Sequence, residues 1–441
     1  MLRRSFFTLI AAAGFCLAAA PAFAEAEDAG ALMPSFAEGD IIDFDGIKKL
    51  KPFLPEEFWD NRDFFFYEGM KLVIGPTQFD YANAAAYDAA TVKHKGESRI
   101  GPDNSLEGYV TGQPFPIEDI DCLGDPQAGV KIMWDHNYRW TGAGGGAKFF
   151  YSYWDRGEQL PLYYEGWAKS VRLSHRPEAQ YEASGGDVFR GEKRKTASGP
   201  VVEAPFDARG IMLLTYRYKS SDKPQSEAKN DDTWVYVPTL RRVRRISTAQ
   251  RTDAVAGTDF TFDDLFSFSG IVPQYEWQCL GERKIVGPTN TMVKAYPYEK
   301  EHNFGPYGLS FSDDRWELRD AIVVRMIPKN QDHPYHHKDI YLDKQTLNSL
   351  YSFAYDQKEE LWKIIWHNKR WSEDQSLTGE FYAGWEGVPK PMDNLIVSDI
   401  IVNVQTGTGN RIEFWDRYGT AFKSKGKIRR FIDVGRLTKG R

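Results

Sequence analysis

Cysteine is scarce in this sequence, which has three cysteines among 441 residues. A chain with so few cysteines for its length is not a disulfide scaffold, because such scaffolds place several bridges within a short, loop-rich fold. If the N-terminal segment that contains Cys16 is removed, Cys122 and Cys279 remain. An oxidising compartment permits one bridge between them, and the sequence does not decide whether it forms.

Long apolar runs are also scarce, and the one that stands out lies at the N-terminus. The chain starts with Arg3 and Arg4, continues with an apolar run over residues 6–20 and reaches a small-x-small pattern that ends at Ala24. This order is typical of a secretory signal peptide, and about fifteen apolar residues are fewer than the roughly twenty that span a membrane. We therefore predict cleavage after Ala24, export to the periplasm and a soluble mature chain.

Excess positive charge is absent as well. The formal net charge is −6 at pH 7, and removing Arg3 and Arg4 with the signal peptide leaves −8. This sign is wrong for a protein that binds phosphate backbones through its overall charge, so we expect no nucleic-acid partner. The chain does contain a basic cluster and, after it, an acidic one, which we expect to pair with each other. These clusters are Arg241, Arg242, Arg244 and Arg245, then Asp259, Asp263 and Asp264.

Common catalytic motifs are missing. The sequence has no G-x-S-x-G elbow, no G-x-x-x-x-G-K-[ST] phosphate loop and no H-E-x-x-H zinc helix. Three histidines, His333, His336 and His337, fit a loop better than a metal site. We therefore predict a protein that is not an enzyme and needs no cofactor or metal. A periplasmic hydrolase with a dispersed carboxylate or histidine site stays the alternative, because active-site residues can lie far apart in sequence.

β-Strand signals, by contrast, fill most of the chain. Short segments rich in β-branched and aromatic residues are separated by turn residues, which predicts a large antiparallel sheet. The clearest example is a three-strand meander over Lys338–Thr346, Leu350–Gln357 and Glu360–Asn368. Further strands are predicted at Gly210–Ser220, Thr233–Pro238, Asp320–Pro328 and Ile400–Thr406.

Helical periodicity is rare. Asp125–Trp140 has an Asp cap, a proline directly after it and apolar residues three and four apart, which predicts an amphipathic helix. The glycines of residues 142–147 predict a flexible link after this helix, and the aromatic residues of Phe53–Met70 are too dense to assign. No stretch has the composition of an interdomain linker, so residues 25–441 are predicted to form a single large domain.

Aromatic residues are abundant: the chain has 13 Trp, 23 Tyr and 28 Phe. Most of them are expected in a core, as in any globular protein. A large sheet has a second use for the surplus, because a curved sheet can enclose an apolar hollow that holds a lipid-like ligand. A hydrophobic ligand is therefore our first functional hypothesis.

Three segments in this order carry a resemblance to a known family: TWVYVPTLRRVRRIS, GTDFTFDDL and IYLDKQTLNSLYSFAYDQKEELWKI. Together they resemble the signature of domain-of-unknown-function family 1329, an exported bacterial family, over most of the chain. That family is similar to the lipoprotein carriers of the LolA/LolB type. The resemblance implies a mainly β fold, with one strongly curved antiparallel sheet that forms an unclosed barrel and a few helices over its concave face.

The resemblance also implies a function. It points to a periplasmic carrier for a lipid or other hydrophobic molecule that works with a transporter of the resistance-nodulation-division type, and it leaves room for peripheral contact with a membrane. It brings no catalytic residues. The two charged clusters would then lie at the rim of the hollow, and aromatic side chains would contact the ligand. These aromatic residues are Phe260, Phe262, Phe266, Trp362 and Trp366.

Overall fold

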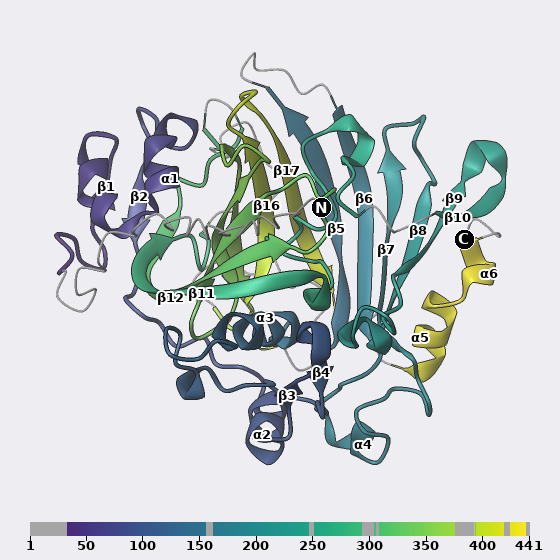
Figure 1. Cartoon of the computed structure of the whole chain (residues 1–441). Helices are drawn as coiled ribbons and strands as arrows, with labels where there is room; N and C mark the ends of the chain where they lie inside the picture. Colours follow the sequence, from purple (N-terminus) through teal and green to yellow (C-terminus); the bar gives the residue numbers. More distant parts are fainter. Residues whose placement is uncertain are drawn as a thin grey trace, which may run out of the picture. The chain divides into compact units, whose positions relative to one another are not determined.

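One long sheet organises the part of the protein that a computed structural model describes (Figure 1). The described residues are 33–155, 162–246, 251–292, 304–305, 308–374, 392, 394–418 and 424–437. The predicted signal peptide and its cleavage after Ala24 lie outside them. The unit that begins at Pro34 contains the fifteen-stranded sheet, in the order β1-β2-β12-β13-β14-β15-β16-β17-β5-β6-β7-β8-β9-β10, with β11 paired to β12.

Most strands of this sheet are long. Their bounds are β1 Ile41–Ile42, β2 Leu72–Ile74, β5 Gly144–Trp154, β6 Leu162–Arg172, β7 Arg194–Ala204, β8 Met212–Tyr218, β9 Asp232–Val237, β10 Arg242–Ile246, β11 Tyr275–Gly287, β12 Arg315–Pro328, β13 His337–Asp343, β14 Ser349–Tyr355, β15 Leu361–Trp371, β16 Asn394–Asn403 and β17 Thr408–Tyr418. A separate small hairpin joins β3 Arg99–Ile100 to β4 Leu106–Glu107.

The helices of the described residues are short. Their bounds are α1 Glu56–Asp60, α2 Ala85–Lys93, α3 Ala128–Tyr138, α4 Ala179–Glu182, α5 Lys425–Phe431 and α6 Val434–Leu437. Short 3-10 turns are η1 Asp45–Lys49, η2 Lys51–Phe53, η3 Arg62–Phe64, η4 Pro102–Asn104, η5 Ile117–Asp119, η6 Lys219–Asp222, η7 Pro238–Leu240, η8 Val255–Gly257 and η9 Val272–Gln274.

The predicted fold class is confirmed: the protein is mainly β, with a large sheet that does not close into a barrel. The sheet ends at β1 on one side and at β10 on the other. The predicted meander is β13, β14 and β15, paired antiparallel in that order. One feature differs from a purely antiparallel sheet, because β2 runs parallel to β12 where Val73 lies opposite Arg315.

Neighbouring residues of β15 point to opposite faces of the sheet, as the pleat of a strand requires. Ile364 and Trp366 pack on the face covered by residues 36–70, which we call the N-terminal face. Ile365 packs on the other face, beneath Phe260. That second face carries α3 farther along the sheet and is called the helix face.

Aromatic side chains fill the N-terminal face. Phe58 of α1 stacks on Phe65 with ring centroids 4.1 Å apart, and its ring lies 5.0 Å from that of Trp366. Trp316 and Tyr351 complete this cluster, and all of these side chains are buried. The dense aromatics of Phe53–Met70 therefore serve as core that covers the sheet, and they occupy the space above Trp366.

The helix predicted within Asp125–Trp140 is confirmed as α3, which packs across β11 and β12 (Figure 1), but it begins at Ala128 with Gln127 as its N-cap, so the predicted Asp125 cap is wrong. Its approach is close, because a Cβ added to Gly129 would lie 2.7 Å from the backbone nitrogen of Gln278 in β11. The flexible link predicted after the helix is wrong for most of its length, since β5 begins at Gly144 and pairs there with Val171 of β6.

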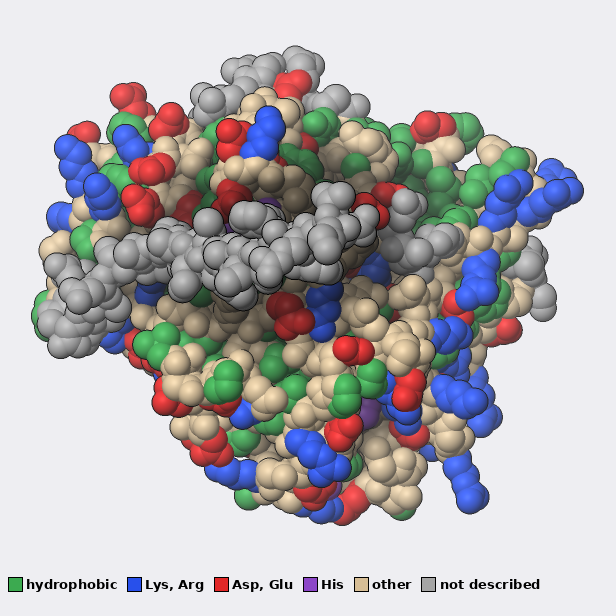
Figure 2. Space-filling model, in the orientation of Figure 1, with side chains coloured by type: hydrophobic (Ala, Val, Ile, Leu, Met, Phe, Trp, Pro, Cys, Tyr) green, Lys and Arg blue, Asp and Glu red, His purple; other side chains and the backbone are tan. Residues whose placement is uncertain are grey.

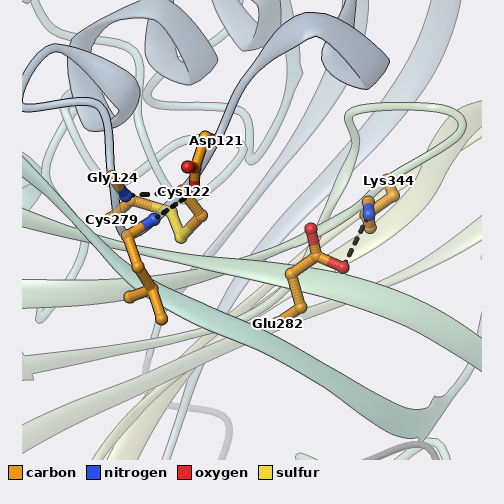
Figure 3. The surroundings of a disulfide bond; sticks show 7 residues. Asp121, Cys122, Gly124, Cys279, Glu282 and Lys344 are labelled. Atoms are coloured by element: carbon orange, nitrogen blue, oxygen red, sulfur yellow. Dashed lines mark hydrogen bonds and ion pairs between the residues drawn. A yellow bond between two sulfur atoms is a disulfide. The ribbon is translucent and has the colours of Figure 1, made fainter.

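A disulfide joins Cys122, in the loop before α3, to Cys279 of β11 (Figure 3). The two residues are 157 positions apart in sequence, with their Cα atoms 5.4 Å apart. Beside the bridge, Asp121 Oδ1 accepts a hydrogen bond from the backbone N–H of Gly124 at 3.0 Å. The bridge therefore ties the segment that carries α3 to the sheet beneath it.

We predict that replacing both bridged cysteines by serine lowers the free energy of unfolding by about 2–5 kcal/mol, because the bridge closes a long loop in the unfolded chain. Urea denaturation of the oxidised protein, with and without reductant, measures the effect. The double variant serves as control, because reductant should not change its stability. Equal stabilities of oxidised and reduced wild-type protein would contradict the prediction.

Candidate functional site

The segment Thr258–Gly270, between β10 and β11, lies on the helix face and is called the cover segment. It follows η8 and contains no helix or strand, and Phe266 and Ser267 adopt left-handed backbone angles, with φ of 60° and 65°. Its sequence contains three aspartates and four phenylalanines. The aspartates bind polar groups of neighbouring elements, and the aromatic rings pack between them.

Asp264 is the deepest attachment of the cover segment. Its fully buried carboxylate accepts hydrogen bonds at 2.6 Å from Lys338 Nζ of β13 and at 2.6 Å from the hydroxyl of Tyr335. Lys363 Nζ of β15 lies 3.4 Å from the same carboxylate. Burial alone would raise the pKa of Asp264, but the two ammonium groups outweigh it and hold that pKa well below its usual range.

The same two lysines also hold the backbone of the cover segment. Lys338 Nζ donates to the carbonyl oxygen of Ser267 at 3.1 Å, and Lys363 Nζ donates to the carbonyl oxygen of Asp259 at 2.7 Å. Both lysine side chains are almost completely buried. Burial lowers the pKa of Lys363, which Asp264 partly offsets. Each lysine therefore fastens the cover segment to the sheet at two points.

The other two aspartates of the segment are attachments as well. Asp259 accepts hydrogen bonds from Asn403 Nδ2 at 2.7 Å and from Thr408 Oγ1 at 2.6 Å, at the turn between β16 and β17. Asp263 forms an ion pair with Arg251 and accepts a hydrogen bond from the Tyr275 hydroxyl at 3.1 Å. All three aspartates therefore turn toward protein groups.

The expected pairing of the arginine cluster with these aspartates is wrong. Arg245 forms an ion pair with Asp232 of β9 instead. The side chains of Arg241, Arg242 and Arg244 are exposed, and no ion pair is found for them within the described residues. The reason is topological: β10 is an edge strand, and β16, β17 and β5 to β9 separate it from β15, where the cover segment is attached.

The aromatic residues predicted to bind a ligand do not all meet. Phe260 is buried against Tyr151 of β5, with ring centroids 5.8 Å apart, and Phe262 packs on Phe260 while 45% of it stays exposed. Phe266 is half-buried, and so is Trp362, which lies against Tyr335. The prediction that Trp366 shares a ligand site with these residues is wrong, because its side chain points to the N-terminal face of the sheet.

An apolar patch lies beneath and beside the cover segment. It consists of buried side chains of the helix face together with a margin of partly exposed ones. The buried members are Phe149, Tyr151, Val202, Ala208, Ile365, Ile401 and Ile412, and the margin contains Leu162, Tyr164, Ala168, Ile211 and Phe414. Phe260, Leu265 and Val255 cover the patch from above. The patch therefore combines a buried apolar centre with a margin of apolar side chains that are partly open to solvent.

A second constellation, which sequence reasoning missed, lies where the cover segment meets β15 and β16. Ser267 Oγ lies 2.9 Å from His367 Nε2, and His367 Nδ1 lies 3.1 Å from Asp399 Oδ1, although the latter two atoms are not aligned as a hydrogen bond. Serine, histidine and aspartate in this order can activate a nucleophile. All three side chains are fully buried, and burial lowers the pKa of His367.

The three histidines of residues 333–337 form no metal site. His333 and His337 are buried, which lowers the pKa of each to about 4, and His337 stacks on Tyr355 at 4.2 Å. In the described part of the chain, no group of three or more His, Cys, Asp or Glu side chains could hold a metal ion. The histidines serve the turn into β13 and the packing of β14.

The residues that hold the cover segment had a weak signal in the sequence. Lys338 and Lys363 each stand in a strand next to buried apolar residues such as Ile340 and Ile364, and a lysine is rarely buried without a carboxylate partner. This pattern predicts that each lysine has a carboxylate partner. It does not say which carboxylate is the partner, because the choice depends on contacts distant in sequence.

We predict that Asp264→Asn destabilises the protein by about 3–5 kcal/mol, because it leaves two buried ammonium groups without a counter-charge. Urea denaturation at neutral pH measures this, and Asp253→Asn, at an exposed position just before the segment, is the matched control. Since the folded pKa of Asp264 is depressed, its contribution is present above the unfolded pKa of about 3.9 and disappears as the pH falls below it.

The triple variant Asp264→Leu, Lys338→Met and Lys363→Met tests the same explanation by removing all three buried charges together. It should recover part of the stability, because no buried charge is left unpaired, while the carbonyl oxygens of Asp259 and Ser267 and the hydroxyl of Tyr335 lose their partners. A wild-type-like Asp264→Asn protein, or a difference from wild type that grows on acidification, would refute a charge-based attachment.

Comparisons with known proteins identify a matching family model and a similar protein sequence. A family model described as protein of unknown function, DUF1329, matches residues 62–416. An uncharacterized protein of Pseudomonas aeruginosa is 25% identical over 285 residues, which are 64% of this chain, and the chain spans 58% of that relative's length. None of the helices in the described part of the chain has the length and apolarity to cross a membrane.

Two solved structures are also similar. A DUF1329 family protein from Desulfovibrio piger has 17% sequence identity and a TM-score of 0.46, with 71% of this chain and 99% of that one covered. A LolA superfamily protein from Nitrosomonas europaea has 10% identity and a TM-score of 0.34, with 64% and 89% covered. Because the family model spans most of the sequence, including the cover segment and the meander, the chain belongs to the DUF1329 family.

Proposed function

We propose that this protein is a periplasmic carrier that binds a lipid or comparable hydrophobic molecule on the apolar patch of the helix face. The observation that carries the proposal is the construction of the cover segment. Polar bonds of Asp259, Asp263 and Asp264 attach it, while its apolar side chains rest on the patch. An apolar molecule can therefore replace the packing of these side chains without breaking the attachments.

The margin of the patch supports this proposal. Leu162, Tyr164 and Ala168 of β6 are partly exposed beside the cover segment, as is Ile211 after β7. The exposed edge of Phe262 continues the apolar surface to the outside. A ligand would bind at this margin first and then displace the side chains of Phe260 and Phe262 from the patch. Neither of these two steps exposes a buried charged group to solvent.

The energy available from such burial is sufficient for carriage. Each methylene group removed from water contributes about 0.8 kcal/mol, so a fourteen-carbon chain would supply on the order of 10 kcal/mol before ordering costs. No charged anchor for the ligand is needed. A carrier that relies on apolar contact alone accepts related molecules, so we expect a class of acyl lipids as cargo.

The remaining elements of the proposal come from the sequence. The N-terminal pattern supports export with removal of residues 1–24, and residues 25–441 would act as one domain. Between two membranes, a carrier must receive its cargo from one partner and pass it to another. An envelope transporter of the resistance-nodulation-division type is the partner we propose, following the family resemblance.

We predict that the protein purified from a periplasmic extract carries a lipid that native mass spectrometry detects, and that the delipidated protein takes up a fluorescent fatty acid. Leu162→Asp and Phe262→Ser should each raise the dissociation constant of the probe at least tenfold, the equivalent of about 1.4 kcal/mol. Leu123→Ser is the matched control, because Leu123 is 79% exposed and lies in the disulfide-bonded loop. An empty protein that binds no fatty acid, sterol or phospholipid probe rules the carrier out.

A hydrolase is the second candidate, and the arrangement of Ser267, His367 and Asp399 favours it. Against it stands the complete burial of all three side chains. Because a nucleophile must reach its ester, we infer that this constellation holds the cover segment in place and that the protein is not an enzyme. The backbone N–H of Phe266, which donates to Asp399 Oδ2 at 3.3 Å, fits that role.

This inference predicts that a fluorophosphonate probe does not label the native protein. Labelling is measured by intact-mass spectrometry, with the urea-unfolded protein as the control for unspecific reaction. Stoichiometric labelling of the native protein that disappears in Ser267→Ala would establish an active serine instead and favour the hydrolase.

A further inference from the structure

Two hairpin loops lie side by side at one end of the sheet. Residues 205–211 connect β7 to β8, and residues 238–241 connect β9 to β10. They are neighbours because β8 pairs with β9, with Met212 opposite Tyr236. A Cβ added to Gly210 would lie 3.0 Å from Cγ of Pro238, so the two loops touch. We call them together the hairpin edge.

The hairpin edge presents apolar side chains to solvent. Phe206 is 89% exposed and Leu240 is 50% exposed. A single exposed apolar residue needs no explanation. Here, however, two stand on adjacent loops, and the loop of Phe206 also places Ala208 and Ile211 on the apolar patch. The loop that carries the exposed phenylalanine therefore also contributes to the surface proposed to bind the ligand.

The same edge is basic. Arg209 of the first loop and Arg241, Arg242 and Arg244 of the second hairpin are all exposed, and the described residues contain no ion pair for any of the four. Figure 2 shows basic side chains projecting from the end of the molecule where Figure 1 places β9 and β10, with hydrophobic side chains next to them. Glu203 and Asp207 are exposed nearby, so the arginines outnumber the carboxylates.

We infer that the hairpin edge is a docking surface for an anionic phospholipid membrane. The inference rests on the carrier function proposed above, and it names the place where cargo would enter or leave. Three features support a membrane as occupant. The apolar side chains stand on loop tips and not in a groove, aromatic rings favour the level of the lipid headgroups, and guanidinium groups attract anionic lipid.

The inference assigns the arginine cluster to contact with anionic lipid headgroups, whereas the sequence predicted pairing with the aspartates that follow it. Edge strands commonly carry charged residues that prevent pairing with other chains. Arg242 and Arg244 lie on one side of β10 and Arg245 on the other, and Arg245 is occupied by Asp232. The arginines without an ion pair are therefore those of the turn and of one side of the strand, where a planar anionic surface can meet them together with Phe206.

Co-sedimentation with large vesicles tests the inference on the full-length mature protein. We expect binding to vesicles of equimolar phosphatidylcholine and phosphatidylglycerol, and at least tenfold weaker binding to vesicles of phosphatidylcholine alone. Phe206→Ser should weaken binding to the anionic vesicles about tenfold, because the side chain that enters the interface is lost. The double variant Arg241→Gln and Arg242→Gln should weaken it to a similar extent and reduce its dependence on salt.

Two matched controls separate this edge from the rest of the surface. Val92→Ser replaces a side chain in α2 that is 78% exposed, and Lys48→Gln with Lys49→Gln removes two exposed charges in η1. Neither should change vesicle binding. Absence of vesicle binding, or equal loss in the control variants, would overturn the inference and leave a protein partner as the occupant of the edge.

The test does not depend on the cargo. Vesicle binding is measured with delipidated protein, and uptake of the fluorescent fatty acid is measured separately on the same variants. If the hairpin edge serves docking alone, Phe206→Ser and the double arginine variant keep the wild-type dissociation constant for the probe. Absence of probe uptake by the wild-type protein, with its vesicle binding intact, would reject the carrier while leaving the docking surface in place.

Discussion

The buried ionic cluster of Asp264, Lys338 and Lys363 is the constraint on which the arrangement of the helix face depends. The two outer strands of one meander, β13 and β15, place lysine side chains beneath other protein elements. Burying an ammonium group without a counter-charge costs several kcal/mol, so a carboxylate has to arrive from elsewhere. The cover segment supplies it. Phe260 and Ser267 lie four and three residues from Asp264 in the sequence. The attachment of Asp264 therefore also fixes Phe260 over the patch and Ser267 beside His367.

The distribution of apolar side chains is the reason for proposing the helix face as the surface that binds a ligand. On the N-terminal face, residues 36–70 fill the space with their own aromatic rings around Phe58 and Trp366. Farther along the sheet, α5 and α6 cover β8 and β9 through Ile428, Ile432 and Leu437. The apolar patch, by contrast, is covered by a segment without regular structure, which can change its side-chain packing at lower cost than a helix or strand.

The loop of residues 205–211 is the path that links the apolar patch to the hairpin edge. Ala208 and Ile211 belong to the patch, and Phe206 in the same loop points outward. A membrane-docked protein would therefore hold the open margin of its binding surface next to the lipid. The strands that carry this path pair with their sequence neighbours, from β5 to β10, so the geometry of the path is set by consecutive hairpins.

The sequence by itself determined the local elements, because their signals act over a few residues. Alternating apolar residues and turn pairs specify β13 to β15, and apolar residues three and four apart specify α3. Only the tertiary structure decided which side chains meet. Asp264 binds lysines 74 and 99 residues away, while the arginines close to it in sequence end on an edge strand. The order of strands in a sheet differs from their order in the sequence, so residues close in sequence can lie far apart in space. The pleat of a strand also places sequence neighbours such as Ile365 and Trp366 on opposite faces of the sheet.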